Sequence, residues 1–90
     1  MLTWTTRELA DIFNMSISGV RGWVNKGWLR AVKTSNYEGL QISCRDLMNF
    51  LDSHQYYKDI FMHKLTSEGL IGGKNSRSVL QYFLKEGLLK

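Results

Sequence analysis

The sequence predicts a mainly α-helical fold with one small β-hairpin. Apolar residues recur with helical spacing over 5–14 and again over 16–27, and only a tight turn separates the two segments. The apolar spacing alternates over 29–42, as in a hairpin, and is helical again from residue 43 onward. Two short helices joined by a tight turn and followed by a hairpin form a winged helix-turn-helix, here continued by additional C-terminal helices.

The composition limits the classes of protein to which the chain can belong. Its 90 residues suffice for one small domain, and its 43% hydrophobic content is typical of a globular chain. The single cysteine, Cys44, excludes an intramolecular disulfide and fits a reducing compartment. The sequence shows no signal peptide and no apolar run near ~18 residues, so we expect a cytoplasmic protein without a membrane span.

The formal net charge of +4 suggests a polyanionic partner. Residues 1–53 carry six Lys or Arg against five Asp or Glu, and residues 54–90 carry six against three. By this count the basic excess lies mainly in the second half of the chain.

The first helix has a complete start signal. Thr5 is the expected N-cap residue, and Glu8, three residues later, completes a capping box. Trp4 and Leu9 have the spacing of a hydrophobic staple around that cap. Asn14 ends the helix, because asparagine tolerates the left-handed conformation that often follows a helix.

The second helix is expected to begin at the N-cap Ser16, to run to Lys26 and to end at Gly27. Helical spacing places three apolar residues on its buried face, namely Val20, Trp23 and Val24. The opposite face is polar and short-chained and carries an arginine; its members are Ser18, Arg21 and Asn25, with Ile17 and Gly22 beside them.

The hairpin is expected to consist of strands over 29–33 and 40–42 with a loop over 34–39. Ser43 and Asp46 then form a second capping box that opens a third helix. We take residues 1–53 as the winged helix-turn-helix domain.

Residues 54–90 read as a helical extension packed on that domain. The helical pattern over 54–68 is either continuous with the third helix or separated from it at Ser53. Glycines at 69, 72 and 73 indicate a loop, and a last helix runs over 76–86 and ends at Gly87. The extension is either an oligomerisation element or a degenerate second helix-turn-helix.

Several short motifs follow one another in an ordered series. They are Thr6-Arg7-Glu8-Leu9-Ala10, Met15-Ser16, Val20-Arg21, Trp23-Val24, Gly27-Trp28-Leu29, Ile42-Ser43, Asp46-Leu47 and Phe50-Leu51. In this order the chain resembles the MerR/excisionase-like helix-turn-helix family over roughly residues 3–52. Each fragment alone is weakly specific, whereas the series is moderately specific.

The resemblance implies a sequence-specific double-stranded DNA-binding protein. Members of the family are excisionases, which act as directionality factors for integrases of phages and mobile elements, or transcription regulators. The resemblance places Arg21 at a recognition-helix position that contacts DNA and Trp23 where many relatives carry an aromatic residue. This chain lacks the proline usual in the first strand, the Gly-Tyr-Arg wing signature of MerR activators and a long C-terminal coiled coil. An excisionase-like protein therefore fits better than an effector-binding regulator, and the resemblance implies a nucleoid-associated protein of a bacterium, phage or plasmid.

DNA binding would divide the polar residues into two groups. Side chains that can reach base edges are Ser18, Arg21 and Asn25. Side chains expected to meet the phosphate backbone, or to act from the wing, are Ser16, Lys26, Arg30, Lys33, Asn36, Tyr37 and Gln41.

The end of the chain repeats the pattern of the second helix. Residues 16–30 align without gaps with residues 76–90, and both read Ser-x-Ser-x-apolar-x-x-aromatic-apolar-x-x-Gly-apolar-Leu-basic. Capped amphipathic helices that end in glycine can converge on this pattern. The alternative is a second, wingless helix-turn-helix whose basic surface is formed by Lys74, Arg77, Ser78 and Gln81.

No residue pattern indicates an enzyme, a metal site or a cofactor. His54 and His63 lack a histidine at i+4 and a second cysteine. Cys44 stands at a helix start, which can lower a thiol pKa, but no histidine constellation accompanies it. We expect Trp4 and Trp23 to be core residues and Trp28 to remain partly exposed.

The expected partners are double-stranded DNA, a second copy in a dimer or cooperative array, and an integrase or other protein. Small readers of this kind usually bind as dimers or on repeated sites. A function from another class remains open, because the first 53 residues are nearly neutral: an interaction adaptor that keeps the fold without specific DNA binding.

Overall fold

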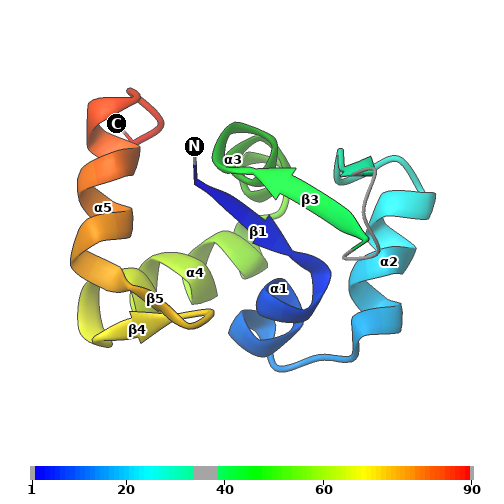
Figure 1. The fold of residues 1–90 in the computed structure, drawn as a ribbon, viewed down its shortest axis with the longest axis horizontal. Helices are drawn as coiled ribbons and strands as arrows, with labels where there is room; N and C mark the ends of the chain where they lie inside the picture. Colours follow the sequence, from blue (N-terminus) through cyan, green and yellow to red (C-terminus); the bar gives the residue numbers. More distant parts are fainter. Residues whose placement is uncertain (1, 34–38, 90) are drawn as a thin grey trace.

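The computed structural model describes residues 2–33 and 39–89, and this part of the chain is mainly helical, as the sequence predicts. It contains five helices and five short strands (Figure 1). In chain order these are β1 (Thr3–Thr5), α1 (Thr6–Phe13), α2 (Ile17–Asn25), β2 (Val32–Lys33), β3 (Leu40–Ser43), α3 (Cys44–Asp52), α4 (Gln55–Ser67), β4 (Leu70–Ile71), β5 (Lys74–Asn75) and α5 (Ser76–Lys85).

The predicted ends of the first two helices are confirmed. Thr5 and Glu8 form a reciprocal capping box at α1, with N···O distances of 3.1 and 2.8 Å. Asn14 follows α1 in the left-handed conformation, with φ of 52°. Ser16 caps α2 by accepting a hydrogen bond from the Gly19 N–H, and Gly27 ends it with φ of 80°. These local signals set the short turn between α1 and α2.

The main sheet has three antiparallel strands in the order β1-β3-β2. The strand β1 was not predicted, since its residues read only as the approach to a helix cap. It pairs with β3 so that Trp4 lies opposite Ile42, and both side chains are fully buried. The sheet therefore ties the N-terminus to the strand that leads into α3.

In the second half, one open alternative is decided and one prediction is wrong. A break at Ser53 and His54 separates α3 from α4, which decides between the two alternatives for this region. The expected loop at the glycines is a hairpin, β4–β5, with Gly72 and Gly73 at its turn. The helix α5 begins at Ser76, as predicted, and its N-cap is Asn75, whose side chain accepts from the Ser78 N–H.

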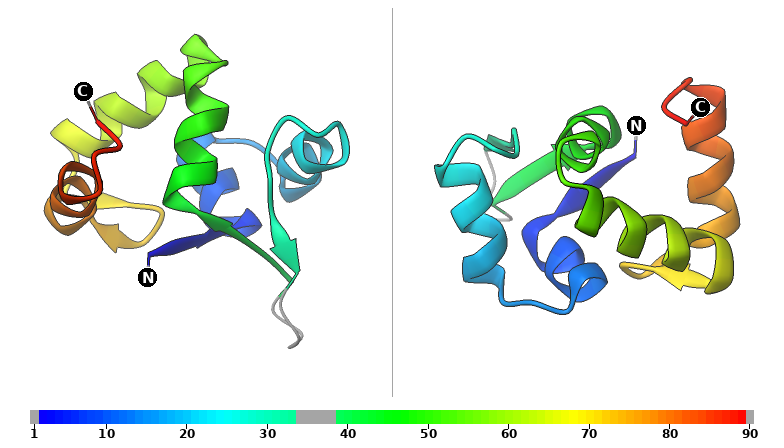
Figure 2. Two further views of the ribbon diagram at one scale, coloured as in Figure 1. Left: turned by 90° about the horizontal axis from the view of Figure 1, so that it is seen from above. Right: turned by 180° about the vertical axis from the view of Figure 1, so that it is seen from behind.

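One hydrophobic core unites both halves of the chain. Phe61 of α4 lies at its centre, with ring-centroid distances of 5.9 Å to Trp4, 6.5 Å to Phe13 and 5.7 Å to Phe83. The helix α4 packs against α1, α3 and α5, and the three views show it crossing the back of the molecule between them (Figure 2). Residues 54–90 thus complete the core that α1 and β1 begin.

Candidate nucleic-acid interface

The orientation of α2 is fixed by the aromatic core. Trp23 is 5% exposed and packs at 4.5 Å from Phe50, 4.7 Å from Tyr57 and 5.6 Å from Phe13, measured between ring centroids. Val20, one turn earlier on the same face, is fully buried. Because this face is held inward, the opposite face turns to solvent, and its exposed residues are Ser18, Arg21 and Asn25. The structure thus brings the three predicted base-reading residues together.

Four exposed cations lie on α2 or in the segment that follows it. Among the described residues, Arg21, Lys26, Arg30 and Lys33 are all exposed and none of them forms an ion pair. The Lys26 ammonium lies 4.5 Å from the centroid of the Trp28 ring, which is 49% exposed, as predicted. The sequence from 12 to 37 contains these four cations and no Asp or Glu. This segment without acidic residues indicates a local positive charge, which a charge count over each whole half of the chain does not reveal.

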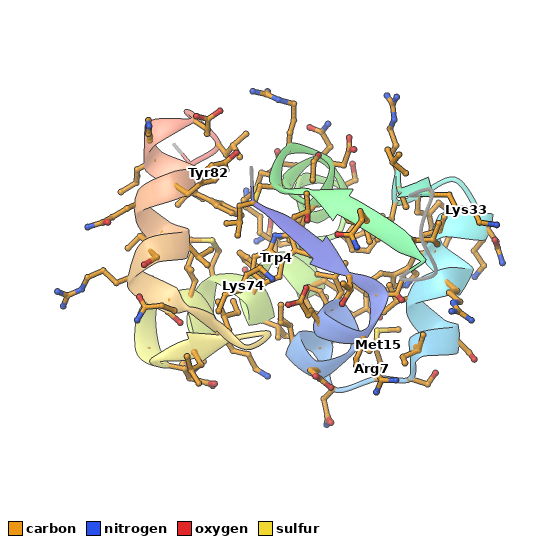
Figure 3. The ribbon with its side chains drawn as sticks, viewed as in Figure 1. Trp4, Arg7, Met15, Lys33, Lys74 and Tyr82 are labelled. Atoms are coloured by element: carbon orange, nitrogen blue, oxygen red, sulfur yellow. The ribbon has the colours of Figure 1, made fainter. Side chains whose placement is uncertain are left out.

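A groove beside α2 contains a residue that the sequence analysis did not single out. Its volume is about 440 Å³, and it is lined by Thr5, Thr6, Arg7, Ile17 and Arg21. Arg7, whose side chain is labelled in Figure 3, lies in the first turn of α1, is exposed, and lines the groove together with Ile17 and Arg21 of α2. The first turn of a helix presents free backbone N–H groups and favours anions. Arg7 could have been found from its place next to the helix cap.

The hydroxyl of Thr6 belongs to the same groove. Thr6 is 8% exposed, and its side chain has no hydrogen-bond partner among the described residues. The Thr6 hydroxyl is not a buried atom without a partner, because in the described part of the chain only Ser76 Oγ is one; it is a polar group on the groove wall. Two arginines, one hydroxyl and a helix N-terminus converge there.

The other residues predicted to contact the DNA backbone differ in their surroundings. The Ser16 hydroxyl accepts the capping hydrogen bond of α2, at 3.1 Å from the Gly19 nitrogen. Gln41 lies on β3, where its Oε1 accepts from the Thr3 hydroxyl at 2.9 Å. Lys33 lies on β2, directly beside β3. Asn36 and Tyr37 lie outside the described residues.

The predicted second basic surface needs a correction. Lys74 does not face solvent with the others: its ammonium lies 2.6 Å from Glu8 Oε2 and 4.8 Å from the centroid of the Trp4 ring. Arg77, Ser78 and Gln81 are exposed on α5.

Ion pairing also reverses the predicted distribution of charge. Glu8 and Asp52, both in the first half, pair with Lys74 and Lys58 of the second half. With both pairs counted as neutral, residues 1–53 keep six cations against three acids, a balance of +3. Residues 54–90 keep four against three, a balance of +1. The basic excess therefore lies on the half of the chain that carries α2.

The histidines and the cysteine of the chain have the following surroundings. The described ranges contain no group of three or more His, Cys, Asp or Glu side chains that could hold a metal ion. His54 Nδ1 lies 2.8 Å from the Phe50 carbonyl oxygen, and its ring stacks on the Phe50 ring. Burial raises the pKa of the Cys44 thiol, which overrides the lowering effect expected at a helix start.

Comparison of the chain with protein-family models, with curated proteins and with solved structures found no match. Among the described residues, the helices are too short or too polar for any of them to cross a membrane.

Proposed function

We propose that this chain is a winged helix-turn-helix protein that binds double-stranded DNA in a sequence-specific way, with α2 as its recognition helix. The observation that carries the proposal is the exposed face of Ser18, Arg21 and Asn25, framed by unpaired cations and held outward by Trp23. An excisionase-like directionality factor or a small transcription regulator of a mobile element is the role we assign.

Direct readout would come from α2. The major groove of B-DNA is about 12 Å wide and admits one α-helix. Arg21 can bond both O6 and N7 of guanine, Asn25 can bond N6 and N7 of adenine, and Ser18 can bond either base. The helix has no acidic residue, so nothing on it repels the phosphates that border the groove.

Phosphate contacts would come from both sides of α2. The groove of Arg7, Thr6 and Arg21 supplies charge, a hydroxyl and a helix N-terminus on one side. Arg30 and Lys33 supply charge on the wing side. Contacts of this kind position the protein on the duplex but carry little sequence information.

The test begins with selection of bound duplexes from random DNA by the full chain. Affinity for the selected site is then measured by fluorescence polarisation for the wild type and for Arg21→Ala. Loss of one bidentate base contact costs about 1–3 kcal/mol, which is roughly 5- to 150-fold in affinity. Arg45→Ala is the matched control, because Arg45 is an exposed arginine on α3, outside the α2 face. Equal affinity and equal site preference in Arg21→Ala and Arg45→Ala would remove α2 from the proposal.

One observation favours the adaptor as a second candidate function. Trp28 and Val32, which follow α2, are 49% and 56% exposed, and exposed tryptophan is frequent at protein interfaces. A chain that showed no affinity for any duplex even at low salt would support the adaptor and exclude the first proposal.

A further inference from the structure

The helix α5 ends in the same way as α2. The Trp28 N–H bonds to the Trp23 carbonyl at 2.9 Å, and the Leu88 N–H bonds to the Phe83 carbonyl at 2.9 Å. The preceding glycines, Gly27 and Gly87, both have positive φ, of 80° and 68°. These bonds are those of a Schellman motif, so the two helix ends can be superposed residue by residue.

This superposition relates the inward positions of the two helices. Trp23 corresponds to Phe83, and both are buried. Val20 corresponds to Leu80, which packs against the same core. The aromatic anchor is therefore shared, while α5 is held in addition by the buried Val79, which corresponds to Gly19.

The superposition also relates the outward positions. Ser18, Arg21 and Asn25 correspond to Ser78, Gln81 and Lys85, and all six are exposed. Serine can bond either base, glutamine can bond N6 and N7 of adenine, and lysine can bond O6 and N7 of guanine. These three exposed positions of α5 thus carry side chains that can read base edges, and α5 has no acidic residue. Arg77 and Leu84 are exposed on the same helix, and Leu84 is 58% exposed.

The two helices lie at opposite ends of the molecule. Figure 1 is drawn with the longest axis horizontal, and α2 and α5 stand at its two ends; Figure 2 confirms this from behind. That axis is 29 Å long. Each helix turns its buried face toward the shared core, so the exposed faces look in opposite directions. A straight duplex bound along one face does not reach the other.

We propose that α5 is a second DNA-binding surface, formed by Arg77, Ser78, Gln81 and Lys85, and that one chain bridges two duplex segments. This inference rests on the proposed function, since α2 must hold the first segment. The α5 surface is the weaker of the two. Glu68 lines the same groove as Arg77, Glu86 is exposed just beyond Lys85, and Lys74 is neutralised by Glu8.

The test is a bridging assay with the full chain. A biotinylated duplex that carries the selected site is fixed on beads, and capture of a second, fluorescent 60-base-pair duplex is measured as protein is added. The informative variant is Gln81→Ala/Lys85→Ala. Its matched control is Gln55→Ala/Lys64→Ala, which removes the same two residue types from α4. Urea midpoints confirm that both variants are folded, and light scattering at the assay concentration gives their mass.

We expect Gln81→Ala/Lys85→Ala to reduce capture of the second duplex about ten-fold or more and to change affinity for a single duplex by less than about two-fold. The α4 control should capture the second duplex as the wild type does, and Arg21→Ala should weaken both binding of the selected site and capture of the second duplex, by roughly 5- to 150-fold. Equal capture by the two double variants would overturn the inference, because a dimer bridging through two copies of α2 gives that result. Loss of capture together with loss of a wild-type dimer would overturn it as well. A wild type that binds one duplex tightly and captures no second one refutes bridging alone, whereas absence of any binding refutes the proposed function itself.

Discussion

Substitution of Gly72 by alanine is expected to destabilise the fold more than the same substitution at its neighbour Gly73. Both residues occupy the turn of the β4–β5 hairpin with positive φ, of 56° and 79°. A Cβ at Gly72 would lie 3.0 Å from Ile12 Cδ1 and 3.1 Å from Trp4 Cζ3. A Cβ at Gly73 would meet nothing within 4 Å. The pair therefore separates the backbone cost from the packing cost.

The magnitude follows from these two costs. A left-handed conformation costs alanine about 1–2 kcal/mol, and this cost applies to both variants. Overpacking adds about 1–3 kcal/mol at Gly72 only. The terminal methyl of Ile12 can turn aside, but the Trp4 ring is rigid and fully buried. Gly72→Ala should thus lose about 2–5 kcal/mol and Gly73→Ala about 1–2 kcal/mol, out of the roughly 5–13 kcal/mol expected for a chain of this size.

Urea unfolding followed by circular dichroism measures the difference directly. With a slope of about 1 kcal/mol per molar urea, the two midpoints should differ by about 1–3 M. Equal midpoints would refute the reasoning, because they would mean that the hairpin turn does not press on Trp4 and Ile12. The C-terminal hairpin would then not be part of the core that supports α1.

Two further predictions concern titration and salt. Because the pKa of Cys44 is raised, the folded state favours the protonated thiol. The protonated thiol therefore contributes fully to stability below the unfolded pKa of about 8.5, and this contribution is lost as the pH rises through the folded pKa. Above about pH 8.5, the unfolding free energy of the wild type should therefore fall relative to that of Cys44→Ala. A difference between the two that stays constant from pH 7 to 10 would contradict this. For Arg7→Ala, the slope of log affinity against log salt should be shallower by about 0.9, because one phosphate contact is lost while site preference stays the same. An unaltered slope would mean that Arg7 makes no contact with a DNA phosphate.

The features that the sequence predicted correctly depend on residues close together in the chain. Thr5 and Glu8 are three residues apart, so their capping box can be read directly from the sequence and fixes where α1 begins. The same holds for Ser16 and Gly27, which bound α2. Once those ends are set, helical spacing alone decides which side chains share a face with Arg21.

The features that the sequence did not predict depend on contacts between distant residues. The strand β1 forms because Trp4 pairs with Ile42 of β3. A segment of three residues is too short to show a periodicity in the sequence. Asn75 and Ser76 are both good N-cap residues, and hairpin register decides between them. Leu70 pairs with Asn75, which makes Asn75 the last strand residue and leaves Ser76 buried.

The distribution of charge shows how far such contacts alter a functional interpretation. Lys74 and Glu8 are 66 residues apart, yet their charges neutralise each other. The Glu8 carboxylate is already positioned for this ion pair, because it accepts the capping hydrogen bond of α1. Since the capping carboxylate is neutralised by a cation from β5, the first turn of α1 keeps Arg7 as its exposed charge next to α2. The formal charges of the sequence assign the excess to the second half, whereas the folded chain concentrates it around Arg21. Under the proposed function, the two cations by which the C-terminal half neutralises Glu8 and Asp52 contribute to the positive charge around α2, so loss of the α4–β5 region is expected to weaken DNA binding by α2.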